Sequence, residues 1–151
     1  FFGAGNYAET LGIHRVSEMN GVGRRMPLTT AAFTVAALGM IGVPYLAGAV
    51  TKEYLKLGTD QAGAAWAIWV LNASSLLNAA YFLPILWRAW LRPPPTQWPH
   101  EHSVGKRETH WLLLLPPLVT AVLVVWAGLF ANSAFSPLAW VKLIAVREYG
   151  P

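Results

Sequence analysis

The charged residues of this chain are grouped so that three long stretches, residues 26–51, 61–87 and 111–141, carry none. Each stretch is longer than the ~20 residues that a helix needs to cross the hydrocarbon core of a bilayer. Only 12% of the chain is charged, and its mean hydropathy is +0.41; a soluble domain carries about 25% charged residues. The sequence therefore predicts an all-α integral membrane protein with about three transmembrane helices.

The spans can be placed from the apolar stretches and their flanks. The first covers about 27–57 and is discontinuous, the second 61–90 and the third 111–131, and residues 137–148 form a short interfacial amphipathic tail. Residues 1–8 look like the last turns of a fourth helix. Because the chain begins at Phe1 without the basic region of a signal peptide, we expect all 151 residues to be the C-terminal portion of a longer transmembrane domain. A short protein with a processed N-terminus is the alternative.

The first span contains a predicted helix break at Gly42, Pro44 and Gly48. Proline has no backbone N–H and disfavours helix in the residue before it, and glycine lowers helix propensity. An unbroken helix over 27–57 would be ~46 Å long, well beyond a ~30 Å hydrocarbon core. Two outcomes stay open: either the helix ends near Gly48 and Lys52 lies at the interface, or the break holds Lys52 deeper in the membrane.

A lysine one turn beyond a helix break is typical of an ion pathway, because intramembrane charges and discontinuous helices mark transport sites. We therefore predict that Lys52 belongs to a proton pathway, with Glu53 beside it as a group that could pair with a neighbouring segment. On the second span Asn72, Ser75 and Asn78 step by three residues and share one arc of the helix. This polar stripe either packs helix against helix or forms the wall of a hydrated channel facing Lys52.

Other chemistries find little support. The chain has no cysteine, so thiolate and disulfide chemistry are excluded. Its net charge of +4 comes from residues between the apolar stretches, which argues against a nucleic-acid interface. His100, His102 and His110 invite a zinc hypothesis, but no fourth ligand is evident in this proline-rich segment, so we expect a solvated loop. No metal and no cofactor is predicted.

The basic residues also predict the orientation of the chain. With three spans, the segments 9–25 and 88–110 share one side of the membrane and carry seven basic residues, against four on the other side. The positive-inside rule then places both loops in the cytoplasm and Lys52 in the outer half of the membrane. A bacterial inner membrane is the expected location.

Three sequence pieces resemble a known family: EMNGVGRRMP (18–27), AGAVTKEYL (47–55) and SSLLNAAYF (74–82). Together they are similar to the C-terminal third of the antiporter-like membrane subunits of complex I, of related hydrogenases and of Mrp-type sodium/proton antiporters. The similarity extends from Phe1 to at least Pro94, and SSLLNAAYF looks nearest to the D-type Mrp subunit. It implies inverted repeats with discontinuous helices, in which the lysine at position 52 belongs to the proton path towards the outer surface.

The resemblance implies a function that the composition alone does not. The main expectation is part of a proton-conducting subunit of a multisubunit cation/proton antiporter, with Lys52 in the outer half-channel. The alternatives are a membrane subunit of a complex I or hydrogenase-type proton-pumping oxidoreductase, and a non-conducting docking fragment. The expected partners are other membrane subunits, the bilayer, protons and, in the antiporter interpretation, sodium. Redox activity would belong to the whole complex, so a transporter subunit is favoured over an enzyme.

Overall fold

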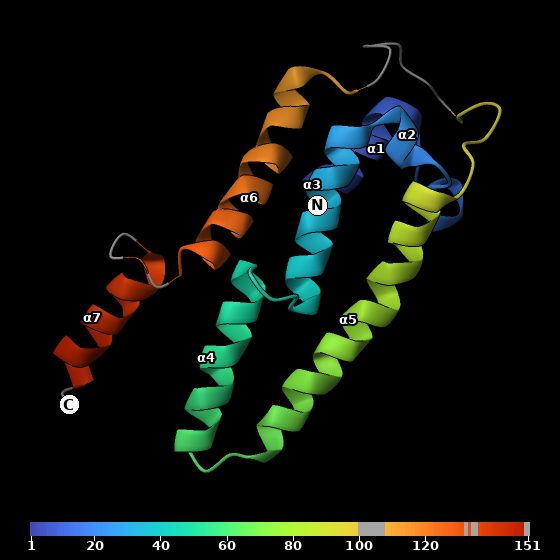
Figure 1. Ribbon diagram of the computed structural model, residues 1–151. Helices are drawn as coiled ribbons and strands as arrows, with labels where there is room; N and C mark the ends of the chain where they lie inside the picture. Colours follow the sequence, from blue (N-terminus) through green and yellow to red (C-terminus); the bar gives the residue numbers. More distant parts are fainter. Residues whose placement is uncertain (100–107, 132, 134–135, 150–151) are drawn as a thin grey trace.

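A computed structural model describes residues 1–99, 108–131, 133 and 136–149 of the chain (Figure 1). All the regular secondary structure in the described part is helical, which confirms the all-α prediction. The α-helices are α1 (Phe2–Leu11), α2 (Val22–Arg25), α3 (Pro27–Ile41), α4 (Ala47–Gln61), α5 (Trp66–Leu91), α6 (Trp111–Leu129) and α7 (Pro137–Tyr149), and a 3-10 helix spans Val16–Glu18.

Two of these helices, α5 and α6, are long and apolar enough to cross a membrane, while α3 is a shorter apolar helix of 15 residues. The stretch expected to form the first span consists of α3 and α4, separated by residues 42–46. Large apolar side chains such as Leu76, Leu77 and Val122 are well over half exposed on α5 and α6. This exposure suits apolar surroundings, because lipid-facing side chains need no protein cover.

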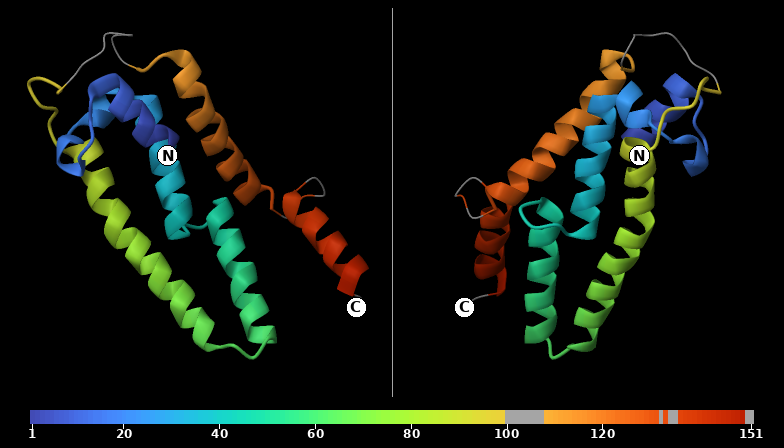
Figure 2. Two further views of the ribbon diagram at one scale, coloured as in Figure 1. Left: turned by 180° about the vertical axis from the view of Figure 1, so that it is seen from behind. Right: turned by 45° about the vertical axis from the view of Figure 1, so that its right-hand side comes forward.

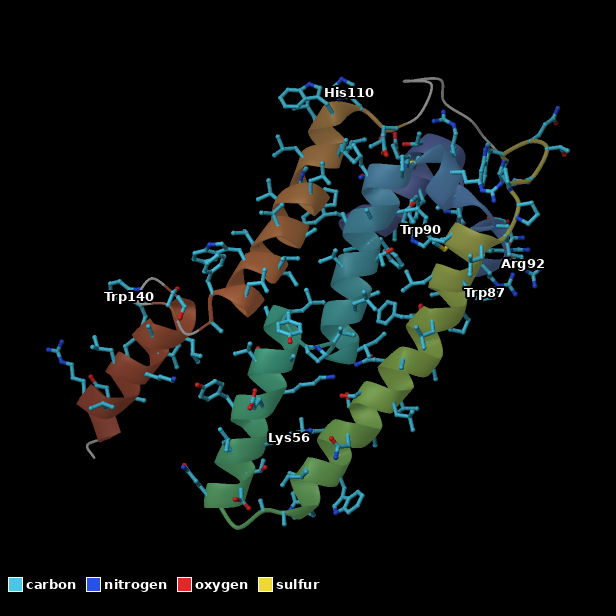
Figure 3. The ribbon with its side chains drawn as sticks, viewed as in Figure 1. Lys56, Trp87, Trp90, Arg92, His110 and Trp140 are labelled. Atoms are coloured by element: carbon cyan, nitrogen blue, oxygen red, sulfur yellow. The ribbon has the colours of Figure 1, made fainter. Side chains whose placement is uncertain are left out.

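The broken pair α3 and α4 forms the centre of the arrangement. The two helices follow each other end to end, and α5 runs alongside both of them (Figures 1 and 2). On the other side α6 packs against α3 and against the beginning of α4, and α7 continues beyond it. Near the far end of α5 the indole nitrogen of Trp90 donates to Thr34 Oγ1 at 3.0 Å, which links α5 to α3 (Figure 3). The break is therefore flanked by helices from later in the sequence.

The sequence explains where α3 begins and ends. Pro27 occupies the first turn, where its missing N–H costs no hydrogen bond. At the other end Gly42 adopts φ +94°, and its N–H reaches the carbonyls of Leu38 and Gly39 while Val43 N–H reaches that of Leu38. Glycine tolerates this left-handed conformation without steric cost, which makes it the common residue after a helix C-terminus.

The segment 9–25 is more than the polar loop that its composition predicts. It contains the 3-10 helix and α2, and its apolar side chains join a buried cluster with α1, the start of α3 and the end of α5. The members are Tyr7, Leu11, Ile13, Met19, Val22, Met26, Ile85 and Ala89. Ile13, Val16, Met19 and Val22 recur every three residues, but the polar residues and glycines between them make the segment look like a loop rather than part of a core.

Glu108 caps α3 from a position 80 residues later in the chain. Its Oε1 accepts from the Leu28 N–H at 2.5 Å, and its Oε2 accepts from Thr29 Oγ1 at 3.0 Å. A carboxylate at a helix N-terminus satisfies N–H groups that have no helical partner and is favoured by the helix dipole. This contact ties the start of α6 to the start of α3.

Replacing Glu108 by alanine should therefore destabilise the fold by about 1 kcal/mol, the usual cost of losing an N-terminal cap. Glu108→Gln, which keeps one acceptor oxygen, should cost less. The measurement is denaturant unfolding in detergent micelles, with Glu148→Ala at an exposed position of α7 as the control. Equal stability of Glu108→Ala and Glu148→Ala would contradict the capping role.

Candidate functional site

The candidate site lies where the break between α3 and α4 faces α5. Lys52 stands in the second turn of α4, and its side chain, partly buried, runs back to the end of α3. Its Nζ donates to the carbonyl oxygens of Met40 at 2.9 Å and Ile41 at 3.0 Å, and to Ser75 Oγ on α5 at 2.6 Å. Three oxygen acceptors thus meet the three N–H donors of one ammonium group.

Pro44 explains why the Met40 carbonyl at the end of α3 can accept hydrogen bonds from side chains. In a continuous helix the Met40 carbonyl would accept from the N–H of residue 44, and proline has none. The neighbouring N–H groups of Gly42 and Val43 are directed to residues 38 and 39 instead. The Met40 oxygen is consequently free to accept from side chains, and it does so from Lys52 and from Asn78 Nδ2 at 3.2 Å.

Two of the three polar residues predicted on the second span face this site. Ser75 accepts from Lys52 and donates to the Leu71 carbonyl at 3.2 Å, and Asn78 lies one turn further along α5 against Met40. Asn72 is exposed, and so is Glu53 beside the lysine. The structure therefore brings Lys52, Ser75 and Asn78 together and does not bring Asn72 or Glu53 to the ammonium.

Two glycines allow the helices around the break to approach closely. Gly48 lies in the first turn of α4, after the break, and an added Cβ there would come within 1.9 Å of the Gly39 carbonyl oxygen on α3. On α6 a Cβ at Gly128 would come within 2.2 Å of the Tyr45 carbonyl oxygen, in the connection itself. Sequence reasoning misses Gly128; the available signal is a glycine inside an apolar helix, since small residues mark close packing in membranes.

The electrostatics of the site come from neutral groups. Helix α3 presents its C-terminal carbonyls, the negative end of its dipole, to the Lys52 ammonium. The third partner is a hydroxyl, and the carboxylate nearest in sequence, Glu53, is exposed. Among the described residues, the ammonium is therefore held by dipoles and hydrogen bonds rather than by a salt bridge.

Two of the three histidines in the zinc hypothesis lie outside the residues that the structure describes. His100 and His102 lie in the segment 100–107, which is not among the described residues. His110 stands at the start of α6, where its Nδ1 accepts from the Leu112 N–H at 3.4 Å. Within the described part of the chain, no group of three His, Cys, Asp or Glu side chains is placed to hold a metal ion.

Comparison with known proteins supports a family assignment through individual relatives; no family model matches the chain. NADH-quinone oxidoreductase subunit N of Desulforudis audaxviator is 41% identical over 143 residues, which cover 90% of this chain and 28% of the relative. NADH-ubiquinone oxidoreductase chain 5 of Metridium senile is 30% identical over 130 residues, covering 85% of this chain and 21% of the relative. Subunit N of Heliobacterium modesticaldum is 26% identical, with 91% of this chain and 27% of the relative covered.

These relatives favour the complex I alternative over the Mrp antiporter that SSLLNAAYF suggested, because the matched proteins carry oxidoreductase names. The chain spans between 21% and 28% of their lengths. Over most of its own length, this chain is homologous to the antiporter-like membrane subunits of complex I.

Proposed function

We propose that the chain is part of a proton-translocating membrane subunit of an NADH-quinone oxidoreductase-type complex, and that Lys52 carries a proton in its outer half-channel. Homology to complex I subunits supports the class of complex, a membrane location and other membrane subunits as partners. The main support for the role of Lys52 is the position of its ammonium, which two backbone carbonyls and Ser75 hold at a helix break.

The contacts suggest how a proton would be held and released. The ammonium is stabilised where it is by the carbonyl ends of α3 and by the Ser75 hydroxyl. When Lys52 gives its proton to water, the amine nitrogen gains a lone pair, and the Ser75 hydroxyl can then turn from the Leu71 carbonyl to donate to it. In a low-dielectric surrounding, a positive charge arriving further inward would repel the ammonium and favour this release.

A second function is favoured by the same contacts. A lysine that hydrogen-bonds the last carbonyls of a helix also acts as a C-terminal cap, stabilised by the helix dipole. Lys52 would then hold α4 and α5 against the end of α3 without ever losing its proton. The chain would in that case be a docking element, and proton transfer would depend on other parts of the complex.

Lys52→Arg separates the two functions. Arginine keeps the charge and the donors, so it should preserve the cap, but it is not deprotonated in proteins. If Lys52 carries protons, the variant should assemble normally and lose proton translocation through this subunit. Unchanged translocation in Lys52→Arg would reject the proton-carrier role and favour the cap.

The assay is NADH-driven acidification of proteoliposomes containing the assembled complex. Lys56→Arg, one turn further along α4, is the matched control and should translocate like the unaltered protein (Figure 3). Ser75→Ala should reduce translocation less than Lys52→Arg, because it removes one of three partners. The same vesicles under an imposed sodium gradient test the sodium/proton alternative, which predicts proton movement without NADH.

A further inference from the structure

The surroundings of the Lys52 Nζ have the composition of a cation site. The Nζ is held by the Met40 and Ile41 carbonyl oxygens and by Ser75 Oγ, all between 2.6 and 3.0 Å from it. We call these three atoms the oxygen cage. Carbonyl rings that replace a hydration shell are how proteins bind and select monovalent cations. The ammonium group of Lys52 thus occupies a position in which a free cation could bind.

The chemistry of the cage favours a monovalent ion of ammonium size. Divalent Ca²⁺ and Mg²⁺ prefer carboxylates and shorter bonds, about 2.3–2.6 Å and about 2.0–2.1 Å. The two carbonyl oxygens of the cage lie at 2.9 and 3.0 Å from its occupant, beyond the calcium range, and all three oxygens are neutral and lie near the negative end of α3. Ammonium itself, methylammonium and potassium match these requirements.

The space for a free ion is created by Gly42. The Lys52 side chain passes directly over this glycine, whose added Cβ would lie 3.1 Å from Lys52 Cδ and 3.4 Å from Nζ. A lysine head that leaves the cage, or a substitution that shortens the side chain, would therefore leave an opening beside a residue that has no side chain to fill it.

We propose that the oxygen cage of Met40, Ile41 and Ser75 is a binding site for a monovalent cation of ammonium size, which Lys52 occupies with its own head group. A free cation binds there whenever the lysine head is withdrawn or removed. The inference rests on the geometry of the cage and holds whether or not Lys52 carries protons. The Lys52 head group and the free ion would therefore compete for the same oxygen cage.

Chemical rescue of Lys52→Ala tests the proposal. The protein is purified in its membrane assembly, and the thermal unfolding midpoint is measured in nanodiscs at fixed ionic strength, with the chlorides of ammonium, methylammonium, potassium or tetramethylammonium. A one-atom ligand binds with a dissociation constant on the order of 0.1 M. Ammonium near ~0.1 M should therefore raise the folded-to-unfolded ratio of Lys52→Ala about twofold, and its unfolding midpoint should keep rising at higher concentration. The unaltered protein, whose cage is filled, should not respond.

Three controls make the result specific. Tetramethylammonium is too large and has no N–H, so it should restore nothing. Lys52→Met fills the opening with an apolar side chain and should not be rescued by any of the ions. Lys52→Ala combined with Ser75→Ala removes one ligand of the cage and should need about tenfold more ammonium, the effect of losing one hydrogen bond to a charged group.

Every outcome decides the question. Should Lys52→Ala fail to assemble without ammonium but assemble with it, the proposal is supported. Failure to assemble in all salts, rescue by tetramethylammonium, or an equal response of the unaltered protein would overturn it. If Lys52→Arg loses proton translocation while Lys52→Ala shows no cation response, the proposed function stands and the cation site is rejected.

Discussion

Replacing Gly48 by alanine should cost about 3 kcal/mol of stability and open the candidate site. An added Cβ would lie 1.9 Å from the Gly39 carbonyl oxygen and 2.8 Å from its carbonyl carbon. These are backbone atoms of α3, so no side-chain rotation can relieve the clash, and overpacking of this kind reaches the upper part of the usual ~1–3 kcal/mol range. Helix α4 would have to move away from α3, carrying Lys52 away from the Met40 and Ile41 carbonyls.

The control for this variant lies in the same helix. Gly58 on α4 has nothing within 4 Å of an added Cβ, so Gly58→Ala should be neutral or stabilise the helix by up to ~1 kcal/mol. Both variants are compared by denaturant unfolding in detergent and by proton translocation in proteoliposomes. If Gly48→Ala is as stable and active as Gly58→Ala, α3 and α4 do not pack as closely as described.

Gly128→Ala should have an effect nearly as large, from the opposite side of the break. Its added Cβ would lie 2.2 Å from the Tyr45 carbonyl oxygen and 2.5 Å from the Leu46 carbonyl carbon. Both are backbone atoms of the connection, so no side-chain rotation can relieve the clash. We expect a loss of about 2–3 kcal/mol and a separation of α6 from the start of α4.

A graded comparison distinguishes this clash from a general effect of substituting glycine. Gly5 on α1 has nothing within 4 Å of an added Cβ, and Gly39 on α3 meets only the Val124 side chain, at 3.4 Å. The expected order of destabilisation in thermal unfolding is therefore Gly128 first, Gly39 well behind it, and Gly5 last. Equal losses at Gly128 and Gly5 would show that α6 does not approach the connection as described.

Part of this architecture was readable from the chain. The uncharged stretches predict helices because a bilayer core requires internally satisfied backbone, and α5 and α6 occupy the second and third of them. The core formed by segment 9–25 cannot be predicted from its own pattern, because its few apolar residues become a core only when α1, α3 and α5 surround them. Nor can Glu108 be recognised as a cap from its local sequence, since the N–H from which it accepts belongs to Leu28, 80 residues earlier.

The sequence by itself determined that the Met40 carbonyl would lack a helical donor, because a proline stands four residues later, and that a lysine would follow on the next helix. Only the tertiary structure decided what replaces the missing donor. Ser75 and Asn78 belong to a helix that reaches the break after the chain has reversed direction, and Gly48 and Gly128 matter through atoms far from them in sequence. Local patterns carry no information on such contacts, because they depend on how whole helices pack.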